Sequence, residues 1–291
     1  MDEACSQIHV QHVQGSPLIL LIPLKISDMS QFRSIESSAA AEVRVYTNAV
    51  EGCKAAAAIM AQLIQENKAA RLGLATGSTP IPVYQELVAL YQNGQISFRD
   101  VETFNLDEYY PISPLNDQSY RWFMNHNLFE QLDIPANRAH VLDGTVPEKA
   151  AEEHARQFEG WIAQGGGLDL QLLGIGRNGH IGFNEPFETI LETACDLPTR
   201  LVELHPVTRS DAAPAFGGLE HVPTHALTVG TRAILNAKKI LILAFGPNKA
   251  DAVRASLQGP PVSTVPASLL QTRADRVVWI LDEAAAQGLN R

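Results

Sequence analysis

The chain has 291 residues, of which 45% are hydrophobic, 19% are charged and 7% are aromatic. This composition is typical of a globular protein and excludes collagen-like, low-complexity and disulfide-scaffold classes. Lysine and arginine number 22 against 32 aspartates and glutamates, so the formal net charge is -10. Such an acidic balance argues against a nucleic acid as the main ligand, and a small anionic ligand would need a local pocket of donors and cations.

The cysteines and the apolar segments predict the cellular location. Cys5, Cys53 and Cys195 are far apart and form no CxxC pair, which favours free thiols in a reducing compartment. The most apolar run, residues 18–24, is too short to span a membrane. No basic residue precedes Lys25, so a signal peptide is not expected. We therefore expect a cytoplasmic protein with neither a membrane partner nor a nucleic-acid partner.

Residues 1–41 differ from the rest of the chain. Their glutamine, serine and histidine residues follow no period, which is typical of an extension or a poorly ordered arm. From residue 42 onward the pattern becomes regular. We expect residues 42–291 to form one domain.

In that domain, short aliphatic runs alternate with stretches of helical periodicity. The predicted strands are 43–46, 72–75, 101–106, 139–142, 168–173, 201–204, 226–229, 240–245 and 277–281, and the predicted helices are 49–68, 80–91, 119–132, 147–163 and 248–257. Strands that alternate with helices indicate βαβ units. We therefore predict an α/β fold with a doubly wound, mostly parallel, Rossmann-like sheet flanked by helices. Ligands of such sheets bind beyond the carboxyl ends of the strands, so the residues that follow each strand are the candidates.

The segment LGLATGSTP, residues 72–80, is a strand followed by Thr76, Gly77, Ser78 and Thr79 and then by a helix start. Glycine allows close approach of a ligand, the hydroxyls donate hydrogen bonds, and a helix N-terminus favours an anion. The segment lacks the Gly-Lys-Ser/Thr of a Walker A loop. On the local pattern, phosphate binding and an ordinary turn with a hydroxyl cap both stay open.

The segment FNLDEY, residues 104–109, ends another strand with two adjacent carboxylates, Asp107 and Glu108. A general base is wanted at such a place. Acidic residues also begin loops simply because water is there, and by itself the motif favours that reading. The position at the strand end makes Asp107 the candidate base.

The segment GIGRNGHIGFNEP, residues 174–186, contains a literal GxGxxG. A dinucleotide site would require these glycines to open a helix, whereas the second half of the segment reads as a loop. What remains is His180, which can pass protons near neutral pH, and Glu185, which can orient it. These two residues are too few for a metal site, so no metal is predicted. A lone loop histidine is more often structural, but glycines bracket this one and let a ligand approach.

The segment FGPNK, residues 245–249, follows a further apolar strand. Lys249 falls in the first turn of the next helix, where a cation opposes the helix dipole. A bound anion would explain this lysine, and a solvated side chain is the alternative.

With these four motifs in order, the sequence resembles the glucosamine-6-phosphate deaminase (isomerase) family of the sugar-phosphate isomerase and 6-phosphogluconolactonase superfamily. The resemblance runs from about Val43 to about Leu281, and FNLDEY together with GHIGFNEP is specific to the deaminases. It implies an enzyme of amino-sugar catabolism that opens the ring of glucosamine 6-phosphate and moves a proton from C2 to C1. Hydrolysis of the resulting C2 imine then gives fructose 6-phosphate and ammonia. The resemblance implies no metal and no redox cofactor.

The resemblance also implies roles for individual residues. Asp107 is the base at C2, His180 assists ring opening, and Glu185 partners His180. The residues implied to hold the phosphate are Thr76, Gly77, Ser78, Thr79 and Lys249.

The chain departs from the family at three places. Many members have aspartate where this chain has Asn178. Asparagine cannot titrate, so Asn178 only orients the proton relay formed by His180 and Glu185. The family's phosphate-binding arginine falls at Pro214, and we expect Arg209 or Arg232 to reach in as a substitute. Residues 187–200 do not reproduce the activator site of the allosteric relatives. The resemblance therefore does not imply allosteric control or a hexamer for this chain, and the sequence leaves a homo-oligomer open.

The leading expectation is a deaminating aldose-ketose isomerase that acts on a small molecule, glucosamine 6-phosphate. Pro214 keeps open the same chemistry on a different amino-sugar phosphate. A third reading is a sugar-phosphate sensor without turnover. Against the sensor, the chain has Asp107, His180 and Glu185 and shows no helix-turn-helix module or basic face.

Overall fold

The computed structural model describes residues 31–36 and 41–289. The strands are β1 (Arg33–Glu36), β2 (Glu42–Tyr46), β3 (Arg71–Leu74), β4 (Glu102–Asn105), β5 (Asp107–Tyr110), β6 (Ala139–His140), β7 (Leu170–Gly174), β8 (Arg200–Glu203), β9 (His225–Thr228), β10 (Ile240–Ala244) and β11 (Val277–Asp282). The helices are α1 (Ala49–Glu66), α2 (Ile81–Gln92), α3 (Tyr120–Asn127), α4 (Glu148–Gln164), α5 (Leu191–Cys195), α6 (Pro206–Phe216), α7 (Thr231–Leu235) and α8 (Ala250–Gln258). A long 3-10 segment, Pro266–Arg276, precedes β11.

Most of the predicted N-terminal extension, residues 1–41, lies outside the described residues. The part that is described includes β1, which pairs antiparallel with β2 at one edge of the sheet. A salt bridge between Arg33 and Glu283 joins this edge strand to the C-terminal segment.

The central sheet has eight strands in the order β1-β2-β11-β10-β7-β3-β4-β6. Every pair except β1 with β2 is parallel. The chain adds β4 and β6 on one side of β3 and then returns to the other side with β7. The predicted doubly wound, mostly parallel α/β fold is therefore confirmed, and the switch in strand order lies between β3 and β7.

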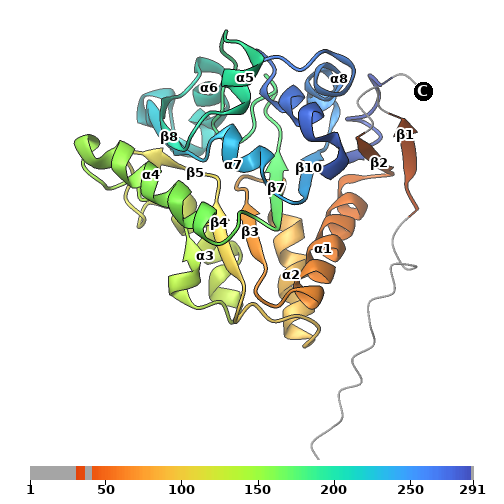
Figure 1. Ribbon diagram of the computed structural model, residues 1–291, viewed down its shortest axis with the longest axis horizontal. Coiled ribbons are helices and arrows are strands. Elements are labelled where there is room, and N and C mark those ends of the chain that lie inside the picture. Colours follow the sequence, from red (N-terminus) through yellow and green to blue (C-terminus); the bar gives the residue numbers. More distant parts are fainter. Residues whose placement is uncertain (1–30, 37–40, 290–291) are drawn as a thin grey trace, which may run out of the picture.

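Helices cover both faces of this sheet (Figure 1). Along β10, Ile240, Ile242 and Ala244 face one core while Leu241 and Leu243 face the other, because neighbouring residues of a strand point to opposite faces. Helices α1, α2 and α3 pack on the second face, and α4, α7 and α8 pack on the first. Burial on both faces explains why these strands are continuous aliphatic runs in the sequence.

Side chains cap the starts of α1 and α3. Asn48 precedes α1, and its side chain accepts a hydrogen bond from the Glu51 backbone N–H at 3.0 Å. Ser119 plays the same part before α3.

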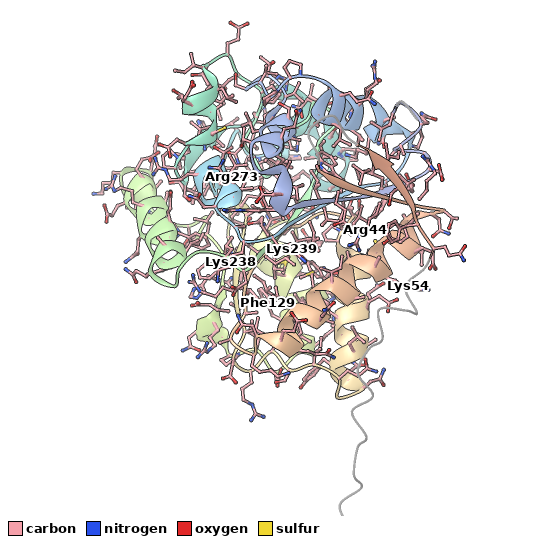
Figure 2. All side chains as sticks on the ribbon, turned by 45° about the vertical axis from the view of Figure 1, so that its right-hand side comes forward. Arg44, Lys54, Phe129, Lys238, Lys239 and Arg273 are labelled. Atoms are coloured by element: carbon pink, nitrogen blue, oxygen red, sulfur yellow. The ribbon has the colours of Figure 1, made fainter. Side chains whose placement is uncertain are left out.

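Lys238 and Lys239 lie just before β10, at its amino end (Figure 2). In the described part of the chain, no helix is both long enough and apolar enough to cross a bilayer.

A second, three-stranded sheet has the order β5-β9-β8 and is antiparallel. The sequence correctly predicts strands near β8 and β9, but it places them in the parallel sheet. The strand predicted over 101–106 corresponds to β4 in the central sheet. The next strand, β5, begins at Asp107 and belongs to the small sheet, and the sequence did not predict it. The small sheet has its own core, which includes Tyr109, Phe183 and Ala226. Strand alternation reports which residues are buried but not which sheet a strand joins, and this explains the error.

Candidate active site

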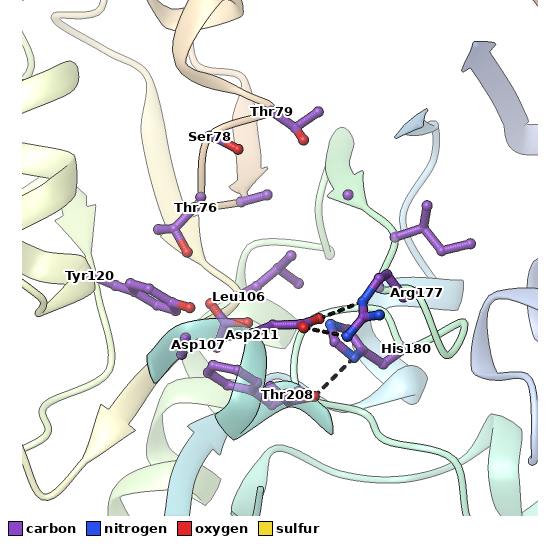
Figure 3. A pocket seen from close by; sticks show the side chains of 18 of the residues that line it. Thr76, Ser78, Thr79, Leu106, Asp107, Tyr120, Arg177, His180, Thr208 and Asp211 are labelled. Atoms are coloured by element: carbon purple, nitrogen blue, oxygen red, sulfur yellow. Dashed lines mark hydrogen bonds and ion pairs between the residues drawn. The ribbon is translucent and has the colours of Figure 1, made fainter. Parts of the chain in front are cut away.

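A cavity of about 290 Å³ opens at the carboxyl ends of β3, β4, β7 and β10. It lies beside the switch between β3 and β7, where ligands of doubly wound sheets bind. The segments that follow these strands, together with helices α3 and α6, supply its charged and polar lining: Thr76, Gly77, Ser78, Thr79, Asp107, Tyr109, Tyr120, Arg177, His180, Thr208, Asp211 and Lys249. Figure 3 shows most of these side chains converging on the same space.

Asp107 is the first residue of β5 and is only 6% exposed. Its Oδ1 has no hydrogen-bond partner among the described residues. Burial, followed by the charge of neighbouring Glu108, raises the pKa of Asp107 to about 8. A buried, unpaired carboxylate is costly to keep. Such a group at a cavity wall has the properties of an acid or base that acts on a bound ligand.

Glu108 does not face the cavity, although it is the neighbour of Asp107. Its carboxylate accepts hydrogen bonds from Ser119 Oγ at 2.7 Å and from the backbone N–H groups of Tyr120 and Arg121 at 2.8 and 3.0 Å. These are N–H groups of the first turn of α3 and would otherwise lack partners. Adjacent residues of a strand point to opposite sides, so one carboxylate lines the cavity and the other caps a helix.

His180 lies in the loop after β7 and lines the cavity. Its Nδ1 is 3.2 Å from Oε2 of Glu185, and Thr208 Oγ1 donates a 2.6 Å hydrogen bond to the other oxygen of Glu185. Burial raises the pKa of Glu185, but the hydrogen bond and charge of His180, with the bonds from Thr208 and Asn178, outweigh burial and leave the pKa lowered. Glu185 is thus an ionised partner that fixes the orientation of the imidazole.

Asn178 does not line the cavity but holds both members of this pair. Its Nδ2 donates to Glu185 Oε2 at 3.0 Å, and its Oδ1 accepts from the His180 backbone N–H at 3.2 Å. The side chain therefore fixes the loop on which His180 is mounted.

The glycines around His180 are required by close packing. A Cβ on Gly176 would lie 2.4 Å from Cε1 of His180, so only glycine leaves room for the ring. Gly182 has a φ of +57°, in the left-handed region that favours glycine, and a Cβ there would lie 3.2 Å from Oγ1 of Thr228. No helix follows β7 until α5, which confirms that the GxGxxG is part of a loop and not a dinucleotide fingerprint.

The loop between β3 and α2 forms another wall of the cavity. Gly77 has a φ of +94°, and a Cβ there would meet open space. The backbone N–H groups of Gly77, Ser78 and Thr79 donate no hydrogen bond to the part of the chain that the structure describes. The start of α2 also lacks a side-chain cap. Free N–H groups and an uncapped helix start suit an anion.

Lys249 reaches the cavity from the turn between β10 and α8. Its Nζ donates a 2.8 Å hydrogen bond to the carbonyl oxygen of Ile175. Lys249 forms no salt bridge with the carboxylates of residues 31–36 and 41–289. Burial lowers its pKa, Asp211 partly offsets this, and Arg177 lowers it further. A half-buried ammonium without a carboxylate partner is available for an anionic ligand.

Arg177 and Asp211 form an ion pair at the same cavity (Figure 3). Arg177 Nε donates to Asp211 Oδ2 at 3.0 Å, and Nη2 donates to Oδ1. The pair joins the loop after β7 to helix α6. Among the described residues, no group of three His, Cys, Asp or Glu side chains is arranged to hold a metal ion.

A family model described as glucosamine-6-phosphate isomerases/6-phosphogluconolactonase matches residues 47–279. A glucosamine-6-phosphate deaminase of Thermoanaerobacter pseudethanolicus is 42% identical over 245 residues, which cover 84% of this chain and 94% of that protein. A deaminase of Cellvibrio japonicus is 46% identical over 221 residues, covering 75% and 80% of the two chains. The chain belongs to the glucosamine-6-phosphate deaminase family.

One solved structure agrees with membership of the deaminase family, and a second shares the fold. The structure of a monomeric glucosamine-6-phosphate deaminase superposes with a TM-score of 0.79 at 38% identity and covers 84% of this chain and 99% of that one. A 6-phosphogluconolactonase of Trypanosoma brucei superposes with a TM-score of 0.69 at 19% identity, covering 85% and 98%, and shares the fold.

Two residues expected at the phosphate of a deaminase lie elsewhere. Arg209 lines a separate cavity and donates to the carbonyl oxygens of Leu219 and Val222, both at 3.1 Å. Arg232 is the second residue of α7, and it pairs with Asp196 at 2.7 Å and Glu159 at 3.5 Å. Each guanidinium is held by its own local partners, and neither lines the cavity that contains Asp107 and His180.

Several cavity residues are not among those predicted from the sequence, including Tyr120, Arg177, Thr208 and Asp211. The sequence does contain a signal for Arg177, since it lies inside the GIGRNGH segment directly after a strand. Thr208 and Asp211 lie on α6, which is not among the predicted helices, and nothing local marks them as site residues.

Proposed function

We propose that this member of the deaminase family converts glucosamine 6-phosphate and water into fructose 6-phosphate and ammonia. The observation that carries the proposal is the cavity itself. A buried, unpaired carboxylate at Asp107, an oriented imidazole at His180 and an unpaired ammonium at Lys249 line one space. An enolising isomerase for a phosphorylated sugar needs these three groups: a base, a proton shuttle and an anion site.

The substrate phosphate binds to the loop after β3 and to Lys249. It carries about two negative charges near neutral pH. The free N–H groups of Gly77, Ser78 and Thr79 donate to its oxygens, and the start of α2 adds a favourable dipole. Binding at this end of the cavity fixes the sugar relative to the reacting groups.

His180 carries the proton in ring opening. The imidazole accepts the proton of the anomeric hydroxyl and delivers a proton to the ring oxygen, so that the C1 aldehyde forms. Nδ1 of His180 faces Glu185, which leaves the other ring nitrogen for the sugar. Glu185, Thr208 and Asn178 are positioning residues, since they act through His180.

Asp107 acts as the base in the isomerisation. Its carboxylate takes the proton from C2 of the open-chain aldehyde and returns it to C1. In the same tautomerisation O1 gains a proton and the C2 amine loses one, so that C1 becomes a hydroxymethyl group and C2 an imine. Water then adds to C2, ammonia leaves, and the C2 carbonyl of fructose 6-phosphate remains. A carboxyl group whose pKa is about 8 is better suited to accept a carbon-bound proton than an ordinary aspartate.

The reaction is an isomerisation followed by a hydrolysis, so its balance requires no redox cofactor. We also propose a cytoplasmic location, which is supported by the free thiols of Cys53 and Cys195. Cys5 lies outside the described residues.

The test is to measure ammonia and fructose 6-phosphate in the same aliquot after incubation with glucosamine 6-phosphate. Equal yields are expected, and Asp107→Asn should lower the rate by roughly 10²- to 10⁴-fold. Binding of glucosamine 6-phosphate without product would overturn the proposal and favour a sensor. Neither binding nor product would direct attention to a different amino-sugar phosphate.

A further inference from the structure

The Arg177–Asp211 ion pair uses the geometry with which arginine binds phosphate. Two parallel N–H groups of Arg177, Nε and Nη2, donate to the two carboxylate oxygens of Asp211. A guanidinium makes the same two-pronged contact with carboxylates and with phosphates. The carboxylate of Asp211 therefore occupies the donor face of Arg177.

The pair lies on the cationic side of the cavity. Lys249 contacts the carbonyl of Ile175, two residues before Arg177 in the loop after β7. Both cations line the cavity with the Thr76–Thr79 loop. Asp211 is the carboxylate that acts on both cations, since it pairs with Arg177 and its charge partly offsets the burial that lowers the pKa of Lys249.

The pair is also easy to break. The side chains of Arg177 and Asp211 are 49% and 45% exposed, so water already screens their attraction. A phosphate dianion brings about twice the charge of a carboxylate. Exchange of Asp211 for a phosphate on Arg177 is therefore electrostatically favourable.

We propose that Asp211 is an internal competitor of the substrate phosphate: it holds Arg177 in the free protein and releases it when a phosphorylated sugar binds. Arg177 then becomes a phosphate ligand together with Lys249 and the Thr76–Thr79 loop. Asp211 sets the affinity of the cavity for phosphorylated ligands, because every such ligand must displace it. The inference rests on the proposed function, since it needs a phosphorylated ligand in this cavity.

The test is isothermal titration calorimetry with inorganic phosphate and with fructose 6-phosphate, which requires no turnover. Asp211→Asn removes the competitor and should tighten binding of both ligands by about threefold. Arg177→Gln should weaken binding by about tenfold, as expected for the loss of charge-assisted hydrogen bonds. In the Arg177→Gln background, Asp211→Asn should no longer tighten binding, because the arginine that it competes for is gone.

A control separates this effect from a change in net charge. Glu153→Gln breaks the exposed Arg156–Glu153 pair on α4 and also removes one negative charge, yet it should leave phosphate affinity unchanged. The inference is overturned if Asp211→Asn leaves affinity unchanged or weakens it. It is also overturned if Asp211→Asn tightens binding equally with and without Arg177. If phosphate binding depends on Arg177 but the protein releases no ammonia, the proposed function is wrong and the inference about Asp211 still holds.

Discussion

Thr208 Oγ1 donates a 2.6 Å hydrogen bond to Oε1 of Glu185, while Oε2 of the same carboxylate lies 3.2 Å from Nδ1 of His180. Thr208 belongs to α6 and the other two residues to the loop after β7. The helix therefore holds the carboxylate that orients the imidazole. Tertiary packing, and not the loop alone, sets the geometry of the relay.

Thr208→Val should lower kcat by about tenfold with little change in KM, which corresponds to the loss of one hydrogen bond to a charged group. Valine has nearly the shape of threonine but cannot donate. Thr208→Ser keeps the donor and should recover most of the lost rate. Steady-state kinetics on the three proteins checks this, and an equal loss in the serine and valine variants would show that the hydroxyl is not the cause.

The pH dependence of kcat/KM should report the buried carboxyl group of Asp107. The base form is the carboxylate, and the pKa of Asp107 is raised to about 8 by burial and by Glu108. Because the active form exists above this pKa, kcat/KM should rise with pH and level off above about 8. A profile that is already flat at pH 6 would contradict this assignment.

Ionisation of the buried Asp107 carboxyl group should lower the free energy of unfolding as the pH rises. A carboxyl group whose pKa is raised on folding stabilises the native state below its ordinary pKa, and this contribution is lost as pH rises toward the raised value. Asp107→Asn has no charge to bury. Its free energy of unfolding should exceed that of the wild type by an amount that grows from pH 3.8 to about 8. At pH 9, above both pKa values, the gain should be roughly 5 kcal/mol. Urea unfolding at pH 5 and pH 9 measures it, and a gain that is the same at both values would rule out the ionisation as its source.

Asn178→Asp should make the fall in rate on the acid side of the pH profile steeper. Asn178 Nδ2 donates to Glu185 Oε2 at 3.0 Å, and an aspartate would replace this donor with a second carboxylate. Two carboxylates so close share a proton, which raises one pKa of the pair. Rate profiles of wild type and variant should therefore differ by one acidic group. Identical profiles would mean that residue 178 does not act on the Glu185–His180 relay.

Lys249→Met should raise KM for glucosamine 6-phosphate by about 10- to 100-fold, because it removes a charged donor to the phosphate. The matched control is Lys238→Met. Lys238 lies at the opposite end of β10 and pairs with Asp169 at the surface (Figure 2). Loss of a surface lysine there should leave KM unchanged. A similar rise in KM for both variants would indicate a general effect of charge and not a contact with the phosphate.

The sequence predicted most of the elements, because burial on both faces leaves continuous aliphatic runs such as Ile240–Ala244. It also predicted the segments that follow β3, β4, β7 and β10, which meet at one edge for a topological reason that does not depend on side-chain detail. Because neighbouring residues of a strand point to opposite sides, the sequence implies that only one of Asp107 and Glu108 faces the cavity. The sequence pattern does not say which of the two it is.

The positions of the arginines were decided by the tertiary structure. Arg209 and Arg232 were expected to bind the phosphate. Instead, Arg209 donates hydrogen bonds to backbone carbonyls and Arg232 forms a salt bridge with Asp196. Arg177 is brought to the cavity together with Asp211, 34 residues away in the chain. The two sheets likewise separate β8 and β9 from the strands that they resemble locally. Local periodicity and motif spacing record burial and backbone geometry, whereas the partner of a charged side chain depends on which distant segments the fold brings within hydrogen-bond distance.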